Sequence, residues 1–379
     1  MRIPLSKKFF VDRAKKGEAD YALMGIVGLI IFFGLLFLSS ASSVYSYKKF
    51  GSTYYVVFHQ ILTGLLPGIA AFYIFSKIDY KKYLRYTHAH FFISVALLLL
   101  VFIPRLSADY GTSRSWINIF GFSLQPSEFV KITFLIFLAS WIQRKGYADI
   151  SDFKRGFLPF LMYLSIISAL MALQPDLGML MVIAFMSLAV YFVAGAKFRH
   201  IGYMCVAGAI AFIAVVFNKP YIANRIKIFL HPSLDRENIG YQIYQAFLAI
   251  GSGGIFGKGF GKSAQKFSYL PEVSSDSIFA VIAEEMGFIV VVVLILLYAA
   301  IMYRGIMIAQ RSPDPFGRFL AAGIVAWITI QTFLNIAVMT GLAPVTGVTL
   351  PFISAGGTSL VASLASIGIL VNISKHSVE

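Results

Sequence analysis

The sequence predicts an all-α integral membrane protein with ten transmembrane helices, and two observations lead to that prediction. First, 58% of the 379 residues are hydrophobic and only 13% are charged, while the mean hydropathy is +0.79; soluble globular domains lie outside this range. Second, ten apolar runs are long enough to cross a hydrocarbon core of about 30 Å. These runs lie near 21–40, 54–76, 86–104, 126–143, 157–173, 177–195, 199–217, 276–303, 318–340 and 353–373.

The polar segments between these runs predict the orientation of the chain. Residues 1–20 form a basic tail, and the apolar run after it exceeds the length of a signal-peptide core, so we expect it to be retained as a helix. With this tail in the cytoplasm, 20 of the 32 Lys and Arg residues fall on inside segments. The positive-inside rule therefore predicts a multi-pass protein with both termini cytoplasmic.

One polar segment, from about 218 to 275, is much longer than the others and lies outside in this orientation, between the seventh and eighth helices. Because it contains many aromatic and aliphatic residues, we expect it to be ordered, with an amphipathic helix at Tyr241–Ile250 along the membrane surface. Its seven basic residues face either anionic headgroups or only solvent. No other polar block could form a soluble domain, so 1–379 is one membrane domain.

Several other classes of function are excluded or disfavoured. The formal charge of +15 is explained by membrane topology, so we expect no nucleic-acid partner. A phosphate-binding loop ending at Lys262 would need glycine at position 256, which is Phe256. We therefore interpret the glycines of 251–261 as close-packing or hinge positions. The single Cys205 excludes an intrachain disulfide.

Three charged residues lie at or near the fourth and sixth helices. Glu128 and Lys131 are three residues apart on the predicted fourth helix, so they are surface neighbours that can neutralise each other. A structural ion pair and a role in a substrate pocket are both open. Asp176 follows a helix-breaking proline at a tight outside turn, where it is expected to cap the sixth helix.

The eighth helix opens with an acid and carries two more inside its apolar run. At about 100° per residue, Asp276 shares a narrow face with Ala280 and Ala283, which can wall a groove. Glu284 and Glu285 point to different sides of the helix, so we expect separate packing contacts, each paired or protonated. Asp276 itself stands where water and a membrane-borne substrate would meet. From the residues alone it is either a helix N-cap or a general base.

Four long motifs occur along the chain: RSWINIFGFSLQPSEFVK (114–131), QPDLG (174–178), YLPEVSSDSIFAVIAEEMG (269–287) and NIAVMTGLAPVTGVTLPFISAGGTSL (335–360). Together with the ten-helix layout, these motifs resemble the SEDS family of cell-wall proteins, the FtsW, RodA and SpoVE group. The last motif looks closer to FtsW and SpoVE than to RodA, which favours a role in division over elongation.

The resemblance implies a peptidoglycan glycosyltransferase that polymerises lipid II at the outer face of the bacterial cytoplasmic membrane. It implies a class B penicillin-binding protein as partner, with other divisome or elongasome membrane proteins. The essential acid of the family falls on Asp276, and the family's Trp and Glu positions fall on Trp116 and Glu272. The chain departs from the family pattern at Ser274, Ser275 and Ser277, in place of His, Thr and Phe, and at Ala355, in place of Tyr.

The implied reaction needs one base, because the acceptor's 4-hydroxyl must lose a proton as it attacks the donor's anomeric carbon. The result is displacement with inversion, without a nucleophilic carboxylate. Arg, Lys or a divalent cation, Mg or Mn, would meet the charge of the pyrophosphate leaving group. The candidates by position are Arg114 and Lys131, with Glu128 beside it, and less directly Lys258, Lys262 and Lys266.

Two alternatives of other classes stay open at this stage. A lipid II flippase would carry ionisable groups through the membrane depth, as the four acids and bases within the helices allow, but repeated halves with broken helices are not evident in the sequence. A non-enzymatic scaffold for a transpeptidase would tolerate loss of the charge at Asp276.

Overall fold

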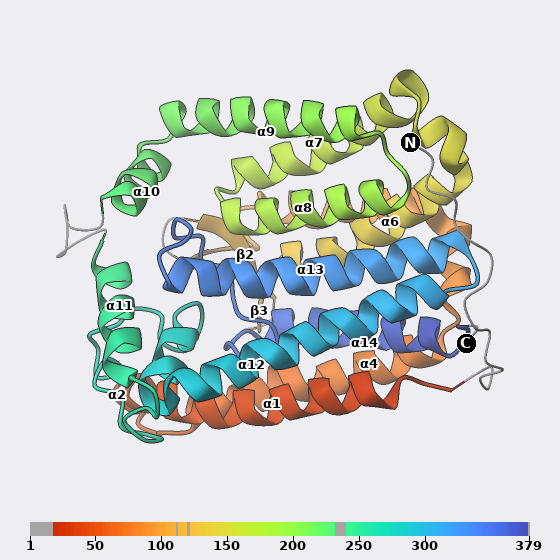
Figure 1. Ribbon diagram of the computed structural model, residues 1–379. Coiled ribbons are helices and arrows are strands. Elements are labelled where there is room, and N and C mark those ends of the chain that lie inside the picture. Colours follow the sequence, from red (N-terminus) through yellow and green to blue (C-terminus); the bar gives the residue numbers. More distant parts are fainter. Residues whose placement is uncertain (1–17, 111–112, 120–121, 232–239, 378–379) are drawn as a thin grey trace.

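The computed structural model describes residues 18–110, 113–119, 122–231 and 240–377. Long helices run side by side in one bundle (Figure 1), and most of the predicted basic tail, 1–20, lies outside the described residues. Ten helical segments match the ten predicted runs. They are α1 (Tyr21–Ala41), α3–η1–α4 (Tyr55–Gln60, Ile61–Leu65, Leu66–Lys77), η2–α5 (Tyr80–Tyr86, Thr87–Leu100), α6 (Pro126–Ile150), η3–α7 (Phe153–Phe157, Leu158–Leu173), α8 (Leu177–Val193), α9 (Phe198–Asn218), α12 (Ile278–Arg311), α13 (Pro315–Met339) and α14 (Gly357–Ser374).

The prediction of an all-α membrane protein is confirmed. Eight of these segments are both long and apolar enough to cross a membrane. Of the other two, α8 has 17 residues, and α6 begins with a charged first turn. The start of α1 and the end of α14 meet at one end of the bundle, where the Asp20 backbone N–H donates to the Ser374 hydroxyl at 3.0 Å. An even number of crossings explains why these two ends meet.

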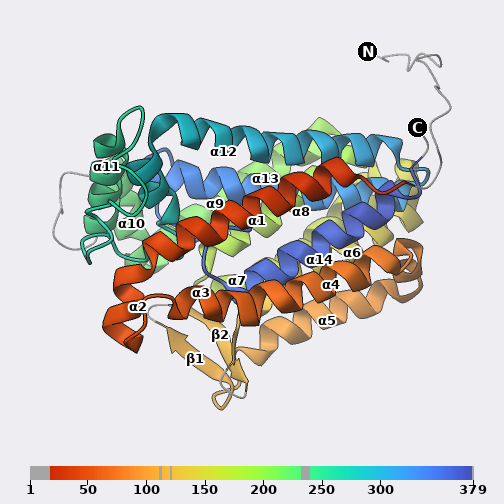
Figure 2. The ribbon, with the colours of Figure 1, turned by 90° about the horizontal axis from the view of Figure 1, so that it is seen from below.

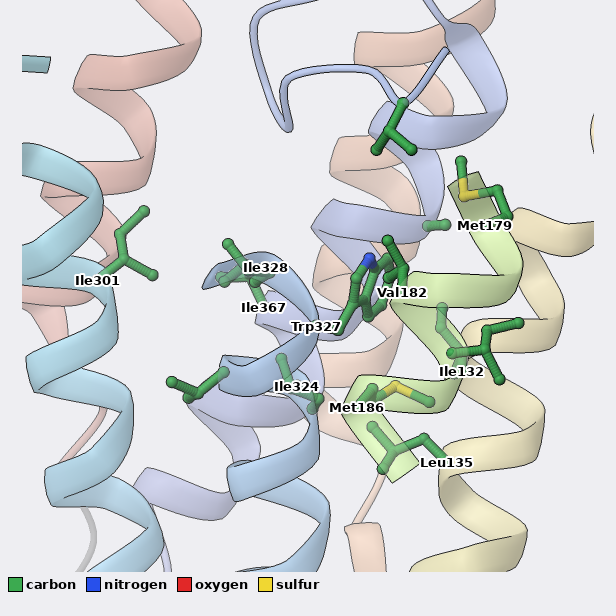
Figure 3. Close-up of a cluster of buried hydrophobic side chains, with 14 of the residues drawn as sticks. Ile132, Leu135, Met179, Val182, Met186, Ile301, Ile324, Trp327, Ile328 and Ile367 are labelled. Atoms are coloured by element: carbon green, nitrogen blue, oxygen red, sulfur yellow. The ribbon is translucent and has the colours of Figure 1, made fainter. Parts of the chain in front are cut away.

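The interior is built around α13 and α14, which neighbouring helices surround. Trp327 of α13 is fully buried, with Ile324 and Ile328 of the same helix beside it. Figure 3 shows this cluster packed against Met186 of α8 and Leu135 of α6. By contrast, α9 exposes nearly all of its apolar side chains. This is the distribution expected where lipid, rather than water, surrounds the outer helices.

A small antiparallel sheet departs from the purely helical prediction. It consists of β1 (Ser107–Tyr110), β2 (Ser113–Ile119) and β3 (Phe122–Leu124) in the order β1-β2-β3. In its register Trp116 lies opposite Ala108, and Ile117 lies opposite Leu124. Along β2 only Ile117, Asn118 and Ile119 alternate in polarity, so the strand has little of the two-residue period of a half-buried strand. The prediction from sequence contains helices alone and assigns no structure to this segment.

The structure describes most of the long segment between α9 and α12. It contains α10 (Pro220–Leu230) and α11 (Tyr241–Gly253), so the predicted helix at Tyr241–Ile250 is confirmed. Figures 1 and 2 place both helices, with the short α2 (Ser43–Phe50), at the end of the bundle away from the end of α14. The candidate acids of the sequence analysis gather at this end.

Candidate active site

Asp276 lies in the connection between α11 and α12, and it is not a helix cap. The helix begins at Ile278, its N-cap residue is Ser277, and that residue makes no side-chain capping hydrogen bond. The N-cap alternative for Asp276 is therefore wrong, because the chain needs one more residue of turn before its dihedral angles become helical. The carboxyl group instead lies just before the first turn of α12, and 9% of the residue is exposed.

The two oxygens of this carboxyl group differ in their surroundings. Oδ2 accepts a hydrogen bond from the Gln242 side-chain amide of α11 at 3.3 Å. Oδ1 is buried and has no hydrogen-bond partner among the described residues. A buried oxygen without a partner is costly, and a group of this kind is an unfilled acceptor for a ligand's hydroxyl.

Burial, and after it the negative charge of Glu272, raises the pKa of the Asp276 carboxyl from 3.8 to about 6. The Gln242 hydrogen bond and the charge of Arg225 act in the opposite direction. The group is therefore ionised at neutral pH but is a stronger base than an exposed aspartate. A base with a pKa near the working pH is well matched to general-base catalysis.

The backbone around Asp276 is fixed by α13 and by the connection between α13 and α14. The Asn335 side-chain amide donates to the Asp276 carbonyl at 2.8 Å and to the Val348 carbonyl at 2.7 Å. The Ala355 N–H donates to the carbonyl of Ser274 at 2.7 Å, and the Ser354 hydroxyl donates to that of Ser275. Three successive carbonyls are thus held from outside the segment, so the position of the carboxylate is set by distant parts of the chain.

Two cavities lie near this segment, although Asp276 itself lines neither of them. One, of about 110 Å³, is lined by Gln242 and Arg225 together with apolar side chains such as Phe247. Apolar walls with a few polar groups are typical of small-molecule sites. The other, of about 300 Å³, is lined by residues 270–275 with Tyr45 and Lys266. The smaller cavity therefore reaches Asp276 through Gln242, and the larger one through the residues that precede Asp276 in the chain.

Glu284 and Glu285 are both paired, as predicted, but their contacts are not separate. Lys258 binds Glu284 at 2.6 Å, and Lys266 binds Glu285 at 3.0 Å. Ser263 contacts both acids, donating its hydroxyl to Glu284 and its N–H to Glu285 at 3.3 Å. The helical projection placed the two side chains on different sides correctly, but one glycine-rich loop wraps around the helix and reaches both. The further donors are Ser40 of α1 and the N–H groups of Gly261 and Ala264.

The glycines of this loop serve close packing at a break in α12, as the sequence predicted. Gly287 has a φ of 74°, and the N–H groups of Lys258 and Gly259 donate to the carbonyls of Glu284 and Glu285 at 3.0 and 2.9 Å. A Cβ atom on Gly257 would lie 2.3 Å from the Glu285 carbonyl oxygen. Only glycine fits, because real Cβ contacts are never this short.

The predicted pair on α6 is confirmed. The Lys131 ammonium lies 2.8 Å from a Glu128 carboxylate oxygen, and both side chains are fully buried. Lys131 also donates to the Gln331 side chain at 2.7 Å and lies over the Trp327 ring, 4.3 Å from its centroid. Its charge is therefore already compensated. Asp176 caps α8, as predicted, accepting from the Met179 N–H at 3.2 Å.

The other predicted site residues lie at varying distances from this arrangement. Glu272 is exposed, accepts from the Ser275 hydroxyl at 2.7 Å and has a φ of 51°. Trp116 lies on β2, half-buried. Arg114 is on the same strand, and its side chain lies outside the described part of the structure. Lys262 is exposed on the glycine-rich loop.

Gln242 and Arg225 were missed by sequence reasoning. A signal for Gln242 existed, because it precedes the buried Ala246, Ala249 and Gly253 of α11 at spacings that put all four on one helical face. A polar side chain on the buried face of an amphipathic helix indicates a buried polar partner. No comparable pattern marks Arg225.

The fold and this site define a class: a multi-pass helical membrane protein that holds one buried, ionisable carboxylate beside two cavities at one end of its bundle. Residues 21–379 match the family model for FtsW, RodA and SpoVE, described as cell cycle proteins. The chain belongs to this family, and the resemblance found in the sequence is confirmed.

Similar proteins match over nearly their whole length. Stage V sporulation protein E of Bacillus subtilis is 40% identical over 96% of this chain and 99% of that protein. The probable peptidoglycan glycosyltransferase FtsW of Geobacter metallireducens is 39% identical over 94% of each.

Two solved structures share the fold. A chain from a study of polymerization and crosslinking by a peptidoglycan synthase complex has a TM-score of 0.79 at 26% identity, over 94% of this chain and 97% of that chain. The rod shape determining protein RodA of Thermus thermophilus has a TM-score of 0.70 at 25% identity, over 95% and 98%.

Proposed function

We propose that this protein is a peptidoglycan glycosyltransferase that polymerises lipid II at the outer face of the bacterial cytoplasmic membrane, with Asp276 as general base. Family membership and the names of the relatives support this activity. The observation that carries the assignment to Asp276 is its buried, unpartnered Oδ1, on a carboxyl whose pKa is about 6. That oxygen is ready to accept a hydroxyl proton at neutral pH.

In the proposed reaction, Oδ1 takes the proton of the acceptor's 4-hydroxyl as that oxygen attacks the anomeric carbon of the donor. The bond from this carbon to the pyrophosphate oxygen breaks, and the configuration at the carbon inverts. The two cavities beside the 270–277 segment suit a reaction between two lipid-linked sugars. Each cavity would hold the reacting part of one substrate.

We propose Arg225 as the cation that faces the leaving group. It lines the smaller cavity, donates to the Val345 carbonyl at 2.8 Å, and its charge acts on Asp276. The lysines first considered are less suitable, because Lys131 and Lys266 are each paired with a buried glutamate. A cation at the edge of a low-dielectric cavity stabilises negative charge more than it would in water.

A divalent cation remains a prediction. The described residues contain no group of three side chains of the kind that holds a metal. Mg²⁺, however, is commonly held by one or two carboxylates together with substrate phosphates. We expect such a cation to be held by the pyrophosphate of the substrate, where it would offset the charge of the leaving group, because the open Oδ1 of Asp276 is assigned to the acceptor hydroxyl.

The proposed partner is a class B penicillin-binding protein, which would cross-link the strands that this chain makes. The fold shared with a chain of a peptidoglycan synthase complex supports this partner. Similarity to FtsW and to a sporulation protein supports a role in division or spore formation.

The test is to purify the chain with and without a class B penicillin-binding protein and to assay polymerisation of lipid II. The wild type should form long glycan strands, and Asp276→Asn should form none. Normal synthesis by Asp276→Asn would overturn the assignment of the base. Transport of lipid II without polymerisation would favour a flippase, and a wild type inactive in every combination would favour a scaffold.

The proposed orientation has a separate test in intact cells. Single cysteines at Ser252 and Ser274, in a Cys205→Ser background, should react with a membrane-impermeant thiol reagent. The matched control is Ala148→Cys, which is exposed in the last turn of α6 and lies within the predicted inside segment 144–155. It should react only after lysis. The reverse pattern would place Asp276 in the cytoplasm and remove wall synthesis as its function.

A further inference from the structure

We propose that Gln242 is a positioning residue that holds one oxygen of Asp276, so that the other oxygen alone meets the acceptor hydroxyl. This inference rests on the proposed function of Asp276 as general base. It concerns how a carboxylate with two equivalent oxygens is presented to the substrate in one orientation.

The contacts of Gln242 use both protons of its amide nitrogen. Nε2 lies 3.3 Å from Asp276 Oδ2 and 3.0 Å from the hydroxyl oxygen of Ser277. Because a carboxylate only accepts hydrogen bonds, the amide must present its nitrogen and not its oxygen to Asp276. The carboxylate thus decides the direction of the amide, and the second bond, to Ser277, anchors the amide while it donates to Oδ2.

The helix that carries Gln242 is held closely against α12. A Cβ atom on Gly253 would lie 2.1 Å from the Ala283 carbonyl oxygen, so the two backbones are in direct contact at this point. Ala246 and Ala249, between Gln242 and this contact, are fully buried. Small residues along this face set the distance between α11 and α12, and with it the distance from Gln242 to Asp276.

The hydrogen bond from Gln242 is long, since 3.3 Å exceeds the usual N–H to O range of about 2.7 to 3.2 Å. Catalytic hydrogen bonds are often long before the substrate binds and tighten in the complex. Gln242 also lines the smaller cavity. A substrate group bound in that cavity would contact the Gln242 amide, so that substrate binding and the position of Oδ2 are linked.

The charged groups that face Asp276 decide the effect of losing this bond. Glu272 on the same segment raises the pKa of the Asp276 carboxyl, while the Gln242 hydrogen bond and Arg225 of α10 lower it; Asn335 of α13 contacts only the backbone carbonyl. Removing the Gln242 donor leaves desolvation and Glu272, which raise the pKa, opposed only by the backbone N–H of Asp276 itself and by the charge of Arg225. The pKa must then rise, and the ionised base is lost at a higher pH.

The experiment compares Gln242→Leu with Gln245→Leu. Gln245 lies three residues further along the same helix, half-buried, and makes no side-chain hydrogen bond in the described structure. For Gln242→Leu we expect kcat for lipid II polymerisation to fall by about tenfold to a hundredfold, the loss typical of a hydrogen bond to a charged group. The acid limb of its pH–kcat profile should move up by about one pH unit, while the lower kcat on the plateau above that limb should persist at high pH. Gln245→Leu should keep the wild-type rate and profile.

A second variant keeps the inference open to refutation if Gln242→Leu does not fold. Ser277→Ala removes the bond that directs the amide, and we expect a smaller shift of the acid limb in the same direction. An unchanged acid limb in either folded variant, or an equal loss in Gln245→Leu, would overturn the inference. Normal activity of Asp276→Asn would instead overturn the proposed function, so the two failures are distinguishable.

Discussion

Replacement of Asp276 by asparagine should stabilise the protein even as it abolishes activity. The native carboxyl has a pKa of about 6 against an ordinary value of 3.8, because it is buried. This difference corresponds to about 3 kcal/mol of unfolding free energy that the native state loses when the group ionises. An amide of the same shape carries no charge and avoids that loss.

The pH dependence follows from the sign of the difference. Below about pH 4 the carboxyl is protonated in both the native and the unfolded state, so the wild type and Asp276→Asn should be equally stable. Between pH 3.8 and about 6 only the unfolded state ionises, and the stability of the wild type falls relative to the variant. Above about pH 6 the difference should be constant, at up to about 3 kcal/mol.

The assay is thermal unfolding of both proteins in detergent from pH 4 to pH 8. A melting temperature of Asp276→Asn that exceeds the wild type at pH 8, and converges with it at pH 4, is the expected result. The reasoning would be refuted by a variant that is less stable at pH 8, or by a difference that does not change with pH. Either result would mean that the carboxylate has a compensating partner in the native state.

Two further predictions concern the buried charges and the break in α12. Removing Glu128 or Lys131 alone should lower the unfolding free energy by about 3 to 5 kcal/mol, because a single change leaves an unpaired buried charge. Removing both should lower it by less. Additive losses in a double-mutant cycle on melting temperature would show that the pair does not interact. Gly287→Ala should prevent normal folding, because the new Cβ would lie 2.2 Å from the Gly257 nitrogen. The control is Gly51→Ala, at a glycine with a similar φ of 71° and open space around it. This change should lower the unfolding free energy by only about 1 kcal/mol. Equal yields and melting temperatures for the two glycine variants would contradict this account.

The membrane spans were predictable from the sequence because lipid imposes a strict requirement on length and polarity. Local contacts were predictable too, since their geometry depends on one helix or one turn. The pair of Glu128 and Lys131 follows from a spacing of three residues, and the cap at Asp176 follows from a broken helix end.

Contacts between distant segments were not predictable in the same way. Gln242 and Asp276 are separated by 34 residues, and no periodicity relates a residue on α11 to the turn before α12. The shared partner of Glu284 and Glu285 depends on how the glycine-rich loop wraps around the helix, which a helical projection does not contain. The β1–β3 sheet was missed because its strands are short and lie between much stronger apolar signals.

The break at Gly287 divides α12 into two parts with different mechanical attachments. The part before it, Ile278–Met286, is hydrogen-bonded to residues 258–266 and packed on α11, while the part after it continues as the long membrane span. The part after it also contacts the segment that follows α11, since the N–H groups of Phe288 and Ile289 donate to the carbonyls of Gly254 and Ile255. This segment therefore joins the two parts of α12 across the break, and Asp276, which Asn335 of α13 also holds, is tied to the membrane spans through lateral contacts instead of through one continuous helix.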